Sequence, residues 1–210
     1  MPLPAEDHDY FLELQTRTGW GKTLARFLEW CLPAPPARVL DVGTGPALAA
    51  ALASQHGHFA VGVDHDPTML AQSLHPTVAL AAAEALPFPT GAFDLTLASN
   101  LLYLLPAPLP ALREMARVTA LGGHVAVLNP SEQMSVAVAR ALADARGLQG
   151  LARETLLNLA ARAEANFRWS PADLAALFER AGLRLTATRT AMGPGLLRWA
   201  LAEVASPRTA

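Results

Sequence analysis

A single cysteine, a single lysine and the absence of a long apolar run set the first limits on this chain of 210 residues. One cysteine, Cys31, excludes an internal disulfide and a four-cysteine zinc site, so we expect a reducing compartment. The leucine-rich residues 101–112 are interrupted by prolines, and no stretch reaches the roughly 20 apolar residues of a membrane-spanning helix. The start, MPLPAEDHDY, lacks the basic and apolar parts of a signal peptide. The sequence therefore predicts a cytoplasmic protein without membrane insertion.

Charge is also scarce. Charged residues make up 16% of the chain and the net charge is −2, while 52% of the residues are hydrophobic. Lys22 apart, all basic residues are arginine, and they form no cluster along the sequence. Nucleic-acid binding usually needs a basic surface, so we expect no nucleic-acid partner. The histidines at 56, 58 and 75 lack metal-ligand spacing; we expect them at the surface and expect no metal site.

What the chain does contain is a regular alternation of short apolar runs with Ala- and Leu-rich helical segments. This alternation predicts a parallel sheet covered by helices on both faces. Two helices separated by TRTGWG precede the sheet, and residues 131–168 hold two helical stretches without a strand. Ser170 as N-cap, Pro171 in the first turn and Gly182 as stop indicate a further helix. The strands are expected at 39–42, 59–63, 78–82, 93–98, 124–128, 184–190 and 196–204.

The stretch RVLDVGTGPALAAAL, residues 38–52, joins the first strand to a helix through two glycines. Glycine at 43 and 45 lets a ligand approach the backbone, and Pro46 suits the first helical turn. A tight turn without a ligand is the alternative interpretation. Asp41 before the turn and Asp64 at the end of the second strand favour a ligand, because both lie where parallel strands end. An acid at position 64 can accept hydrogen bonds from ribose hydroxyls, which predicts a nucleoside-bearing cofactor.

The spacing of this stretch distinguishes two classes of cofactor. A dinucleotide fingerprint needs a third small residue at position 48, which is leucine here. Asp41 would repel a pyrophosphate but suits a cationic ligand. A nicotinamide-dependent oxidoreductase is therefore the less favoured alternative.

Four segments in order resemble the motifs of class I S-adenosylmethionine-dependent methyltransferases, most closely the small-molecule and quinone-type ones. They are VLDVGTGPA, VGVDHDPTML, AEALPFPTGAFDLTLAS and LREMARVTALGGHVAVL, which span about 39–128, and SPADLAALFERAGL extends the resemblance to about 183. The resemblance implies an α/β fold: a Rossmann-like three-layer sandwich whose seven-stranded, mostly parallel sheet has an antiparallel last strand, with a helical cap. It implies one domain, divided into an N-terminal helical arm (1–36), a cofactor-binding half (37–129), a helical insertion or lid (130–168) and a C-terminal helix with a strand hairpin (169–210).

The same resemblance implies methyl transfer from S-adenosyl-L-methionine to a small molecule, with release of S-adenosyl-L-homocysteine. The nucleophile (oxygen, nitrogen or carbon) and the oligomeric state stay open. Asp41 would engage the amino end of the cofactor, Asp64 its ribose, and His65 would pack against adenine. The full set of implied cofactor-binding residues is Asp41, Gly43, Thr44, Gly45, Asp64, His65, Ala83, Glu84, Asn100 and Leu101. Candidate substrate-pocket residues are Asn100, Tyr103, Tyr10 and Trp20, and no catalytic base is identified.

Three positions depart from the family pattern. Ala47 replaces the third glycine and Leu121 a frequent proline, and both changes are mild. Ala82 stands where related sequences often carry an aspartate that accepts from the adenine amino group. Ala82 and the missing base keep open a second function, that of a non-catalytic cofactor-binding or regulatory protein with the same fold.

Overall fold

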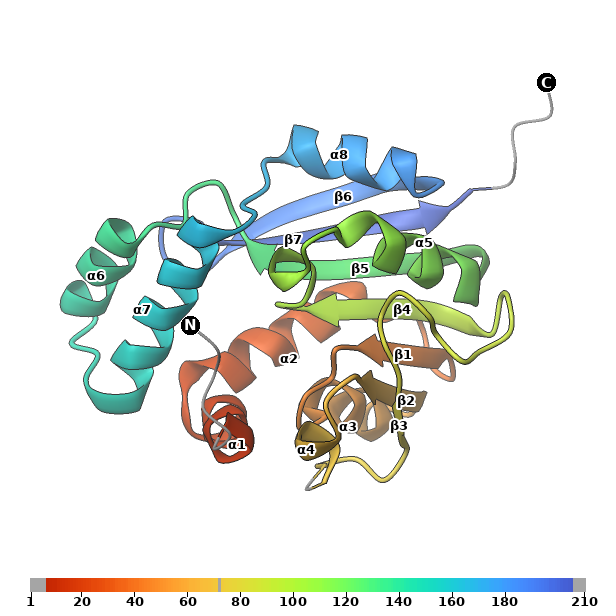
Figure 1. Cartoon of the computed structure of the whole chain (residues 1–210), viewed down its shortest axis with the longest axis horizontal. Coiled ribbons are helices and arrows are strands. Elements are labelled where there is room, and N and C mark those ends of the chain that lie inside the picture. The colour runs from red at the N-terminus through yellow and green to blue at the C-terminus, as the bar shows by residue number, and fades with distance from the viewer. Residues whose placement is uncertain (1–6, 72, 206–210) are drawn as a thin grey trace.

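The computed structural model describes residues 7–71 and 73–205, with side chains from Asp9 onward, and within them seven strands form one sheet (Figure 1). The strand order is β3-β2-β1-β4-β5-β7-β6. β7 runs antiparallel to β5 and β6, and the other pairs are parallel. The expected seven-stranded, mostly parallel sheet is therefore confirmed. The strands are β1 (Arg38–Val42), β2 (Phe59–Asp64), β3 (Val78–Leu80), β4 (Phe93–Ser99), β5 (Thr119–Pro130), β6 (Leu183–Ala191) and β7 (Leu197–Val204).

Helices cover both faces of this sheet, and a third group of helices lies at the carboxyl ends of its parallel strands. In Figure 1, α5 and α8 lie on one face and α2 and α3 on the other, while α1, α6 and α7 gather at the end to which β1 and β4 point. The helices are α1 (Asp7–Arg17), α2 (Gly19–Cys31), α3 (Leu48–Gln55), α4 (Pro67–Leu70), α5 (Pro108–Val118), α6 (Val136–Ala145), α7 (Gly150–Ala165) and α8 (Pro171–Arg180), with a 3-10 turn η1 (Leu102–Leu104).

The core has two parts because successive strand residues point to opposite faces of the sheet. Val39 belongs to the cluster under α2 and α3, whereas its neighbour Leu40 belongs to the cluster under α5 and α8. Phe27 and Phe178, both fully buried, lie on the two sides. Each such side chain contributes roughly 1.5–3 kcal/mol by leaving water. Strands buried on both faces explain why the sequence shows continuous apolar runs.

The structure corrects several boundaries predicted from the sequence. β3 ends at Leu80 instead of residue 82, because its partner β2 ends at Asp64. β5 begins at Thr119, before the glycine pair, with a shift in register against β4. The placement of Pro46 in the first helical turn was wrong: α3 begins at Leu48, because Ala47 adopts a left-handed conformation (φ +62°). The N-cap at Ser170 is confirmed and forms a capping box with Asp173.

The turn between α1 and α2 fixes the N-terminal arm over the sheet edge. The Thr18 hydroxyl accepts a hydrogen bond from the amide of Trp20 (3.1 Å) and donates to the carbonyl of Leu14 (2.6 Å). A Cβ at Gly21 would lie 2.3 Å from the Gln15 carbonyl oxygen, closer than any real contact. Glycine at position 21 therefore allows α1 to lie directly against α2.

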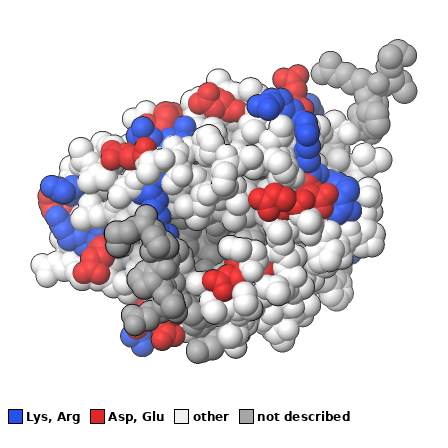
Figure 2. All heavy atoms as spheres, in the orientation of Figure 1, with Lys and Arg blue, Asp and Glu red and all other residues white. Residues whose placement is uncertain are grey.

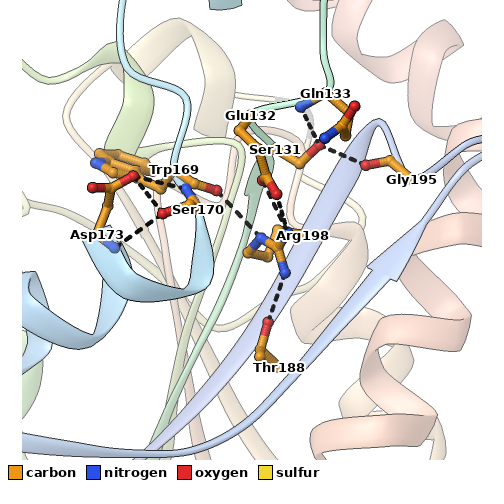
Figure 3. A network of polar contacts seen from close by, with 9 residues as sticks. All are labelled: Ser131, Glu132, Gln133, Trp169, Ser170, Asp173, Thr188, Gly195 and Arg198. Carbon is orange, nitrogen blue, oxygen red and sulfur yellow. Dashed lines mark hydrogen bonds and ion pairs between the residues drawn. The ribbon is translucent and has the colours of Figure 1, made fainter.

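A buried arginine ties the segments that flank the helical insertion to the sheet (Figure 3). Arg198 of β7 is only 5% exposed, and its Nη2 donates to both carboxylate oxygens of Glu132 (2.7 and 2.8 Å) in an ion pair. Its guanidinium also donates to the Trp169 carbonyl and the Thr188 hydroxyl (both 3.2 Å). Both ends of the 131–168 segment are thus held by one side chain.

Candidate functional site

The strand order creates a crevice at the carboxyl edge, between β1 and β4. From β1 the chain moves outward through β2 to β3 and then returns to β4 on the other side of β1. Ligands of open α/β sheets bind at such a reversal. A cavity of about 240 Å³ lies here, which we call the switch-point cavity. Nine residues singled out in the sequence line it: Tyr10, Trp20, Gly43, Gly45, Asp64, His65, Asn100, Leu101 and Tyr103.

The glycine loop after β1 is fixed by the neighbouring strand. The amides of Gly43 and Thr44 both donate to the Val63 carbonyl (2.8 and 2.9 Å). Gly43 has φ +69°, and a Cβ there would lie 2.9 Å from the Leu101 side chain. A Cβ at Gly45 would meet only the Gln15 amide, at 3.8 Å. The loop therefore packs closely at Gly43 and leaves its backbone open to the cavity at Gly45.

Asp41 lies beneath this loop and does not line the cavity. One carboxylate oxygen accepts the Thr44 hydroxyl at 2.5 Å, while the other, Oδ1, is buried without a partner. Burial raises the pKa of Asp41 to about 7, the Thr44 hydrogen bond opposes this rise, and the nearby Asp64 adds to it. A Cβ at Gly62 would lie 2.8 Å from the Thr44 hydroxyl oxygen, so glycine at 62 leaves room for this contact. A cation bound next to Asp41 would lower this pKa again and so favour the charged carboxylate.

Asp64 ends β2 on the wall of the cavity and uses both of its oxygens. Oδ2 accepts the amide of Gly45 (2.9 Å) and Oδ1 the amide of Asp66 (3.0 Å). The imidazole Nδ1 of His65 lies 3.3 Å from Oδ1. A carboxylate oxygen can accept more than one hydrogen bond, so Asp64 still has acceptor capacity toward the cavity.

Asn100, which follows β4, adopts a strained backbone conformation for a non-glycine residue (φ +54°). Its amide donates to the Leu128 carbonyl at 2.7 Å, which holds the turn against β5. Its side-chain oxygen is buried and unpaired, as is that of Gln15 in α1. Together with Asp41 Oδ1, three unpaired acceptors occupy this edge. Buried acceptors without donors suit a ligand that brings N–H groups or positive charge.

Three aromatic side chains close the cavity from the side of the helices. Trp20 and Tyr103 are 8% and 3% exposed, and Tyr10 is half-buried. Burial raises the pKa of Tyr103 to about 12, although Arg162 opposes the rise, so this phenol stays protonated at neutral pH. The amide of Tyr103 lies 3.4 Å from the Asn129 side-chain oxygen, a contact that places η1 beside the end of β5.

Some predicted residues lie elsewhere. Thr44 does not line the cavity and donates its hydroxyl to Asp41, and Ala83 and Glu84 follow β3 without lining the cavity. Ala82 and Glu84 are both exposed. The expectation of surface histidines was wrong for His58 and His75, which are buried; the His75 ring is held by the Ala60 carbonyl at 2.9 Å. Over residues 7–71 and 73–205 no three His, Cys, Asp or Glu side chains are grouped as metal ligands.

Polar residues of the cavity that were missed in the sequence as site residues include Gln15, Asn158 and Arg162. Gln15 lies on α1 and Arg162 on α7, and both line the switch-point cavity. Gln15 and Arg162 each lie on a helix whose sequence carries no motif. Only the docking of α1 and α7 against the sheet edge brings them to the site.

Comparison with known proteins agrees with this geometry. A family model described as a methyltransferase domain matches residues 40–127, which include both acids and the glycine loop. Over this segment, which makes up less than half of its length, the chain is similar to methyltransferases. An uncharacterized methyltransferase of Mycobacterium sp. (strain KMS) is 39% identical over 95 residues, which cover 43% of this chain and 37% of that one. A phosphatidylethanolamine N-methyltransferase of Cereibacter sphaeroides is 36% identical over 102 residues, or 44% of this chain and 50% of that one. The chain thus matches half or less of the length of these two relatives.

Solved structures resemble the chain in fold over most of its length. One chain from a complex that contains the Haloferax volcanii Trm112 methyltransferase activator has a TM-score of 0.72 at 16% identity, covering 98% of this chain and all of that one. An S-adenosylmethionine-dependent methyltransferase from Mesorhizobium loti has a TM-score of 0.64 at 19% identity, covering 88% and 97%. At these identities the likeness concerns the fold, including the helical elements outside residues 40–127.

The visible surface carries few charges. Figure 2 shows white side chains over most of this face, and most blue groups adjoin red ones. On this face, arginine and lysine form no continuous basic stripe. Within the described residues, no helix has the length and hydropathy needed to cross a membrane.

Proposed function

We propose that this chain transfers a methyl group from S-adenosyl-L-methionine to a small-molecule acceptor and releases S-adenosyl-L-homocysteine. The observation that carries the proposal is the group of three unpaired buried acceptors, from Asp41, Gln15 and Asn100, at the strand reversal. The cofactor is cationic at its sulfonium and its ammonium, and its ammonium brings N–H donors. These acceptors fit that end of the molecule. Bound there, the cofactor would supply an activated methyl group.

Each part of the cavity has a role in this proposal. Asp41, which lies behind the cavity wall, acts through its charge on the amino end, and Gly43 and Gly45 line the path of the cofactor. Asp64 takes the ribose hydroxyls, in addition to the two amides it already holds. His65 and Met69 flank the adenine. Ala83 and Glu84 would approach the adenine only after a rearrangement of the loop that follows β3.

Methyl transfer is an in-line displacement, so the protein mainly has to orient the reactants and exclude water. Tyr10, Trp20 and Leu14 cover the cavity from the N-terminal arm, and Leu159 covers it from α7. We propose that the 130–168 segment acts as a lid over the acceptor. Tyr103, whose phenol stays protonated, serves as a hydrogen-bond donor toward the acceptor. An acceptor that arrives already deprotonated needs no base from these residues.

Calorimetric titration of the chain with S-adenosyl-L-homocysteine, with NADH as a competitor, tests cofactor choice. We expect a dissociation constant in the micromolar range for the homocysteine derivative, and no displacement by NADH. Binding of NADH alone would favour the oxidoreductase.

A screen of small-molecule extracts with methyl-labelled S-adenosyl-L-methionine tests the transfer. We expect label in at least one low-molecular-weight product. Cofactor binding without any labelled product across extracts would favour the non-catalytic cofactor-binding protein.

A further inference from the structure

A second cavity of about 390 Å³ adjoins the switch-point cavity at the β6 end of the carboxyl edge. Three arginines from three separate elements line it: Arg26 of α2, Arg146 after α6 and Arg189 near the end of β6. We call it the arginine cavity. Among the described residues that line it, none is acidic.

These three arginines differ from those arginines of the chain that form ion pairs with carboxylates. Arg38, Arg117 and Arg198 all form ion pairs with carboxylates. Within the described residues, the side chains of Arg26, Arg146 and Arg189 have no carboxylate partner; Arg189 rests over the ring of Trp199, 5.4 Å from its centre. Three like charges around one cavity repel each other, and a bound anion would remove this cost.

A fourth donor lies in the cavity wall. Trp199 is 3% exposed, and its indole N–H is buried without an acceptor. The hydroxyls of Thr18, Thr23 and Thr155 each donate to the backbone carbonyl four residues earlier in the chain. Apart from the hydroxyl of Thr190, the side-chain polar groups left free in the wall are N–H donors: the three guanidinium groups and the Trp199 indole. A buried unpaired donor beside three unpaired cations points to a ligand that supplies oxygen acceptors and negative charge.

The two cavities share a wall made of Trp20, Thr155 and Leu159. Residues 152, 155, 156 and 159 of α7 follow helical spacing along the arginine cavity, and residues 155, 158, 159 and 162 follow it along the switch-point cavity. A ligand of moderate length can therefore have one end in each cavity, with its apolar middle against Trp20 and Leu159.

We propose that the arginine cavity binds the anionic group, a carboxylate or a phosphate, of the methyl acceptor, whose apolar part extends past Trp20 toward the switch-point cavity. This inference rests on the proposed function, in which the acceptor is the small molecule that receives the methyl group. It assigns Arg26, Arg146 and Arg189 as residues that determine acceptor specificity and do not touch the cofactor.

Alkyl anions test the proposal on the full chain saturated with S-adenosyl-L-homocysteine. The probes are hexyl phosphate, hexanoate and hexanol, titrated at low salt while tryptophan fluorescence and heat are recorded. We expect at least one anion to bind ten times more tightly than hexanol, and the tighter of the two anions identifies the head group. Salt should weaken this binding, because the three guanidinium groups are exposed to solvent.

The variant Arg26→Gln/Arg146→Gln/Arg189→Gln should bind the anions at least tenfold more weakly and keep its hexanol and S-adenosyl-L-homocysteine affinities within twofold. Arg113→Gln, which removes an exposed arginine of α5 outside both cavities, is the matched control and should change nothing. If the triple variant unfolds, the three single variants and Trp199→Phe replace it. Each should bind the anions about threefold more weakly than wild type.

Two results would overturn the inference: equal affinity for hexanol and both anions, or anion binding that the triple variant leaves unchanged. Failure of S-adenosyl-L-homocysteine to bind the wild-type chain contradicts the proposed function instead. Titration of the wild-type chain with S-adenosyl-L-homocysteine, made before any alkyl anion is added, distinguishes the two failures.

Discussion

At the β1–β2 end of the carboxyl edge the charged side chains are aspartates, whereas at the β6–β7 end they are arginines. Asp41, Asp64 and Asp66 end or follow the first two strands, and Arg189 and Arg198 belong to the last two. The acids stand at a strand reversal that suits a cationic ligand, and three arginines surround a cavity that suits an anionic one. One sheet edge is thereby divided by charge into two compartments with a common wall.

The basic end also shows that arginines on neighbouring strands can have different roles. Arg198 is buried and its donors are used within the fold, while Arg189 on the neighbouring strand is exposed and unpaired apart from its contact with an aromatic ring. Pairing, and not residue type, separates an arginine that holds the fold from one that is free to bind a ligand. The same distinction applies at the acidic end, where Asp64 uses both oxygens and Asp41 only one.

The largest effect should come from removing the charge of Asp41. Its pKa is about 7 in the folded chain against 3.8 for the unperturbed group, so the folded state holds a proton that the unfolded state has lost. Stability of the unliganded chain should therefore fall as pH rises from about 4 to 7. Asp41→Asn removes this fall. The difference in free energy of unfolding between the variant and wild type should therefore shift by about 3 kcal/mol in favour of the variant from pH 5 to pH 8.

Urea unfolding at the two pH values measures this gain. Asp94→Asn is the control, because Arg38 lowers the pKa of Asp94 and its removal should not stabilise the chain at pH 8. A constant difference between Asp41→Asn and wild type at both pH values would show that Asp41 is not the strained acid of this edge.

Replacing Arg198 separates the arginine of the fold from those of the cavity. Arg198→Met leaves the Trp169 carbonyl, the Thr188 hydroxyl and Glu132 without their donor. Because the Glu132 side chain is 36% exposed and can be hydrated, we expect a loss of about 2 kcal/mol, below the value for a fully buried pair. Arg189→Met should cost less than about 0.5 kcal/mol. Urea midpoints of the two variants measure the difference, and equal losses would remove the distinction.

The cofactor side of the comparison is tested by Asp64→Ala. Loss of charged hydrogen bonds should weaken S-adenosyl-L-homocysteine binding by about 1–3 kcal/mol, roughly tenfold to a hundredfold. Asp94→Ala, at the opposite edge of the sheet, should bind normally. Calorimetry gives the affinities, and thermal unfolding checks that Asp64→Ala is folded. A folded variant with wild-type affinity would end the assignment of Asp64 to the ribose.

The smallest effect concerns the backbone between the acids. Ala47 is buried with φ +62°, and glycine there relieves about 1–2 kcal/mol of strain while losing a buried methyl and gaining chain freedom. We expect Ala47→Gly to change stability by less than about 0.5 kcal/mol. Ala50→Gly, equally buried but within α3, should cost about 2 kcal/mol. Similar losses for both variants in urea unfolding would show that Ala47 is unstrained.

The acidic compartment could be predicted from the sequence because its residues follow consecutive strands. The carboxyl ends of parallel strands meet at one edge, so counting from Gly43 to Asp64 already places the glycine loop and the acid together. Asn100 follows β4 by the same logic. The match to a methyltransferase domain depends on the same motifs, since they fall almost entirely within residues 40–127.

The basic compartment could not be predicted in this way. Arg26, Arg146 and Arg189 are far apart in the sequence and come from a helix, a helix end and a strand, and no spacing rule connects them. Which helical face meets the cavity depends on how α2 and α7 pack against Trp199 and the β6–β7 turn. The same reason hid Gln15 and Arg162. The proposed contact of Glu84 with adenine stays a prediction, since Glu84 is exposed in the turn after β3 and does not line the cavity.

Gly21 touches neither cavity, yet it determines how closely the N-terminal arm covers one of them. Any side chain there would meet the Gln15 carbonyl, so α1 would have to move away from α2 and carry Tyr10, Phe11 and Gln15 with it. The volume offered to a ligand is therefore adjustable by substitution at a position that never contacts the ligand. In an evolving lineage, or in a designed library, acceptor range can change at residue 21 while every cavity-lining side chain stays the same.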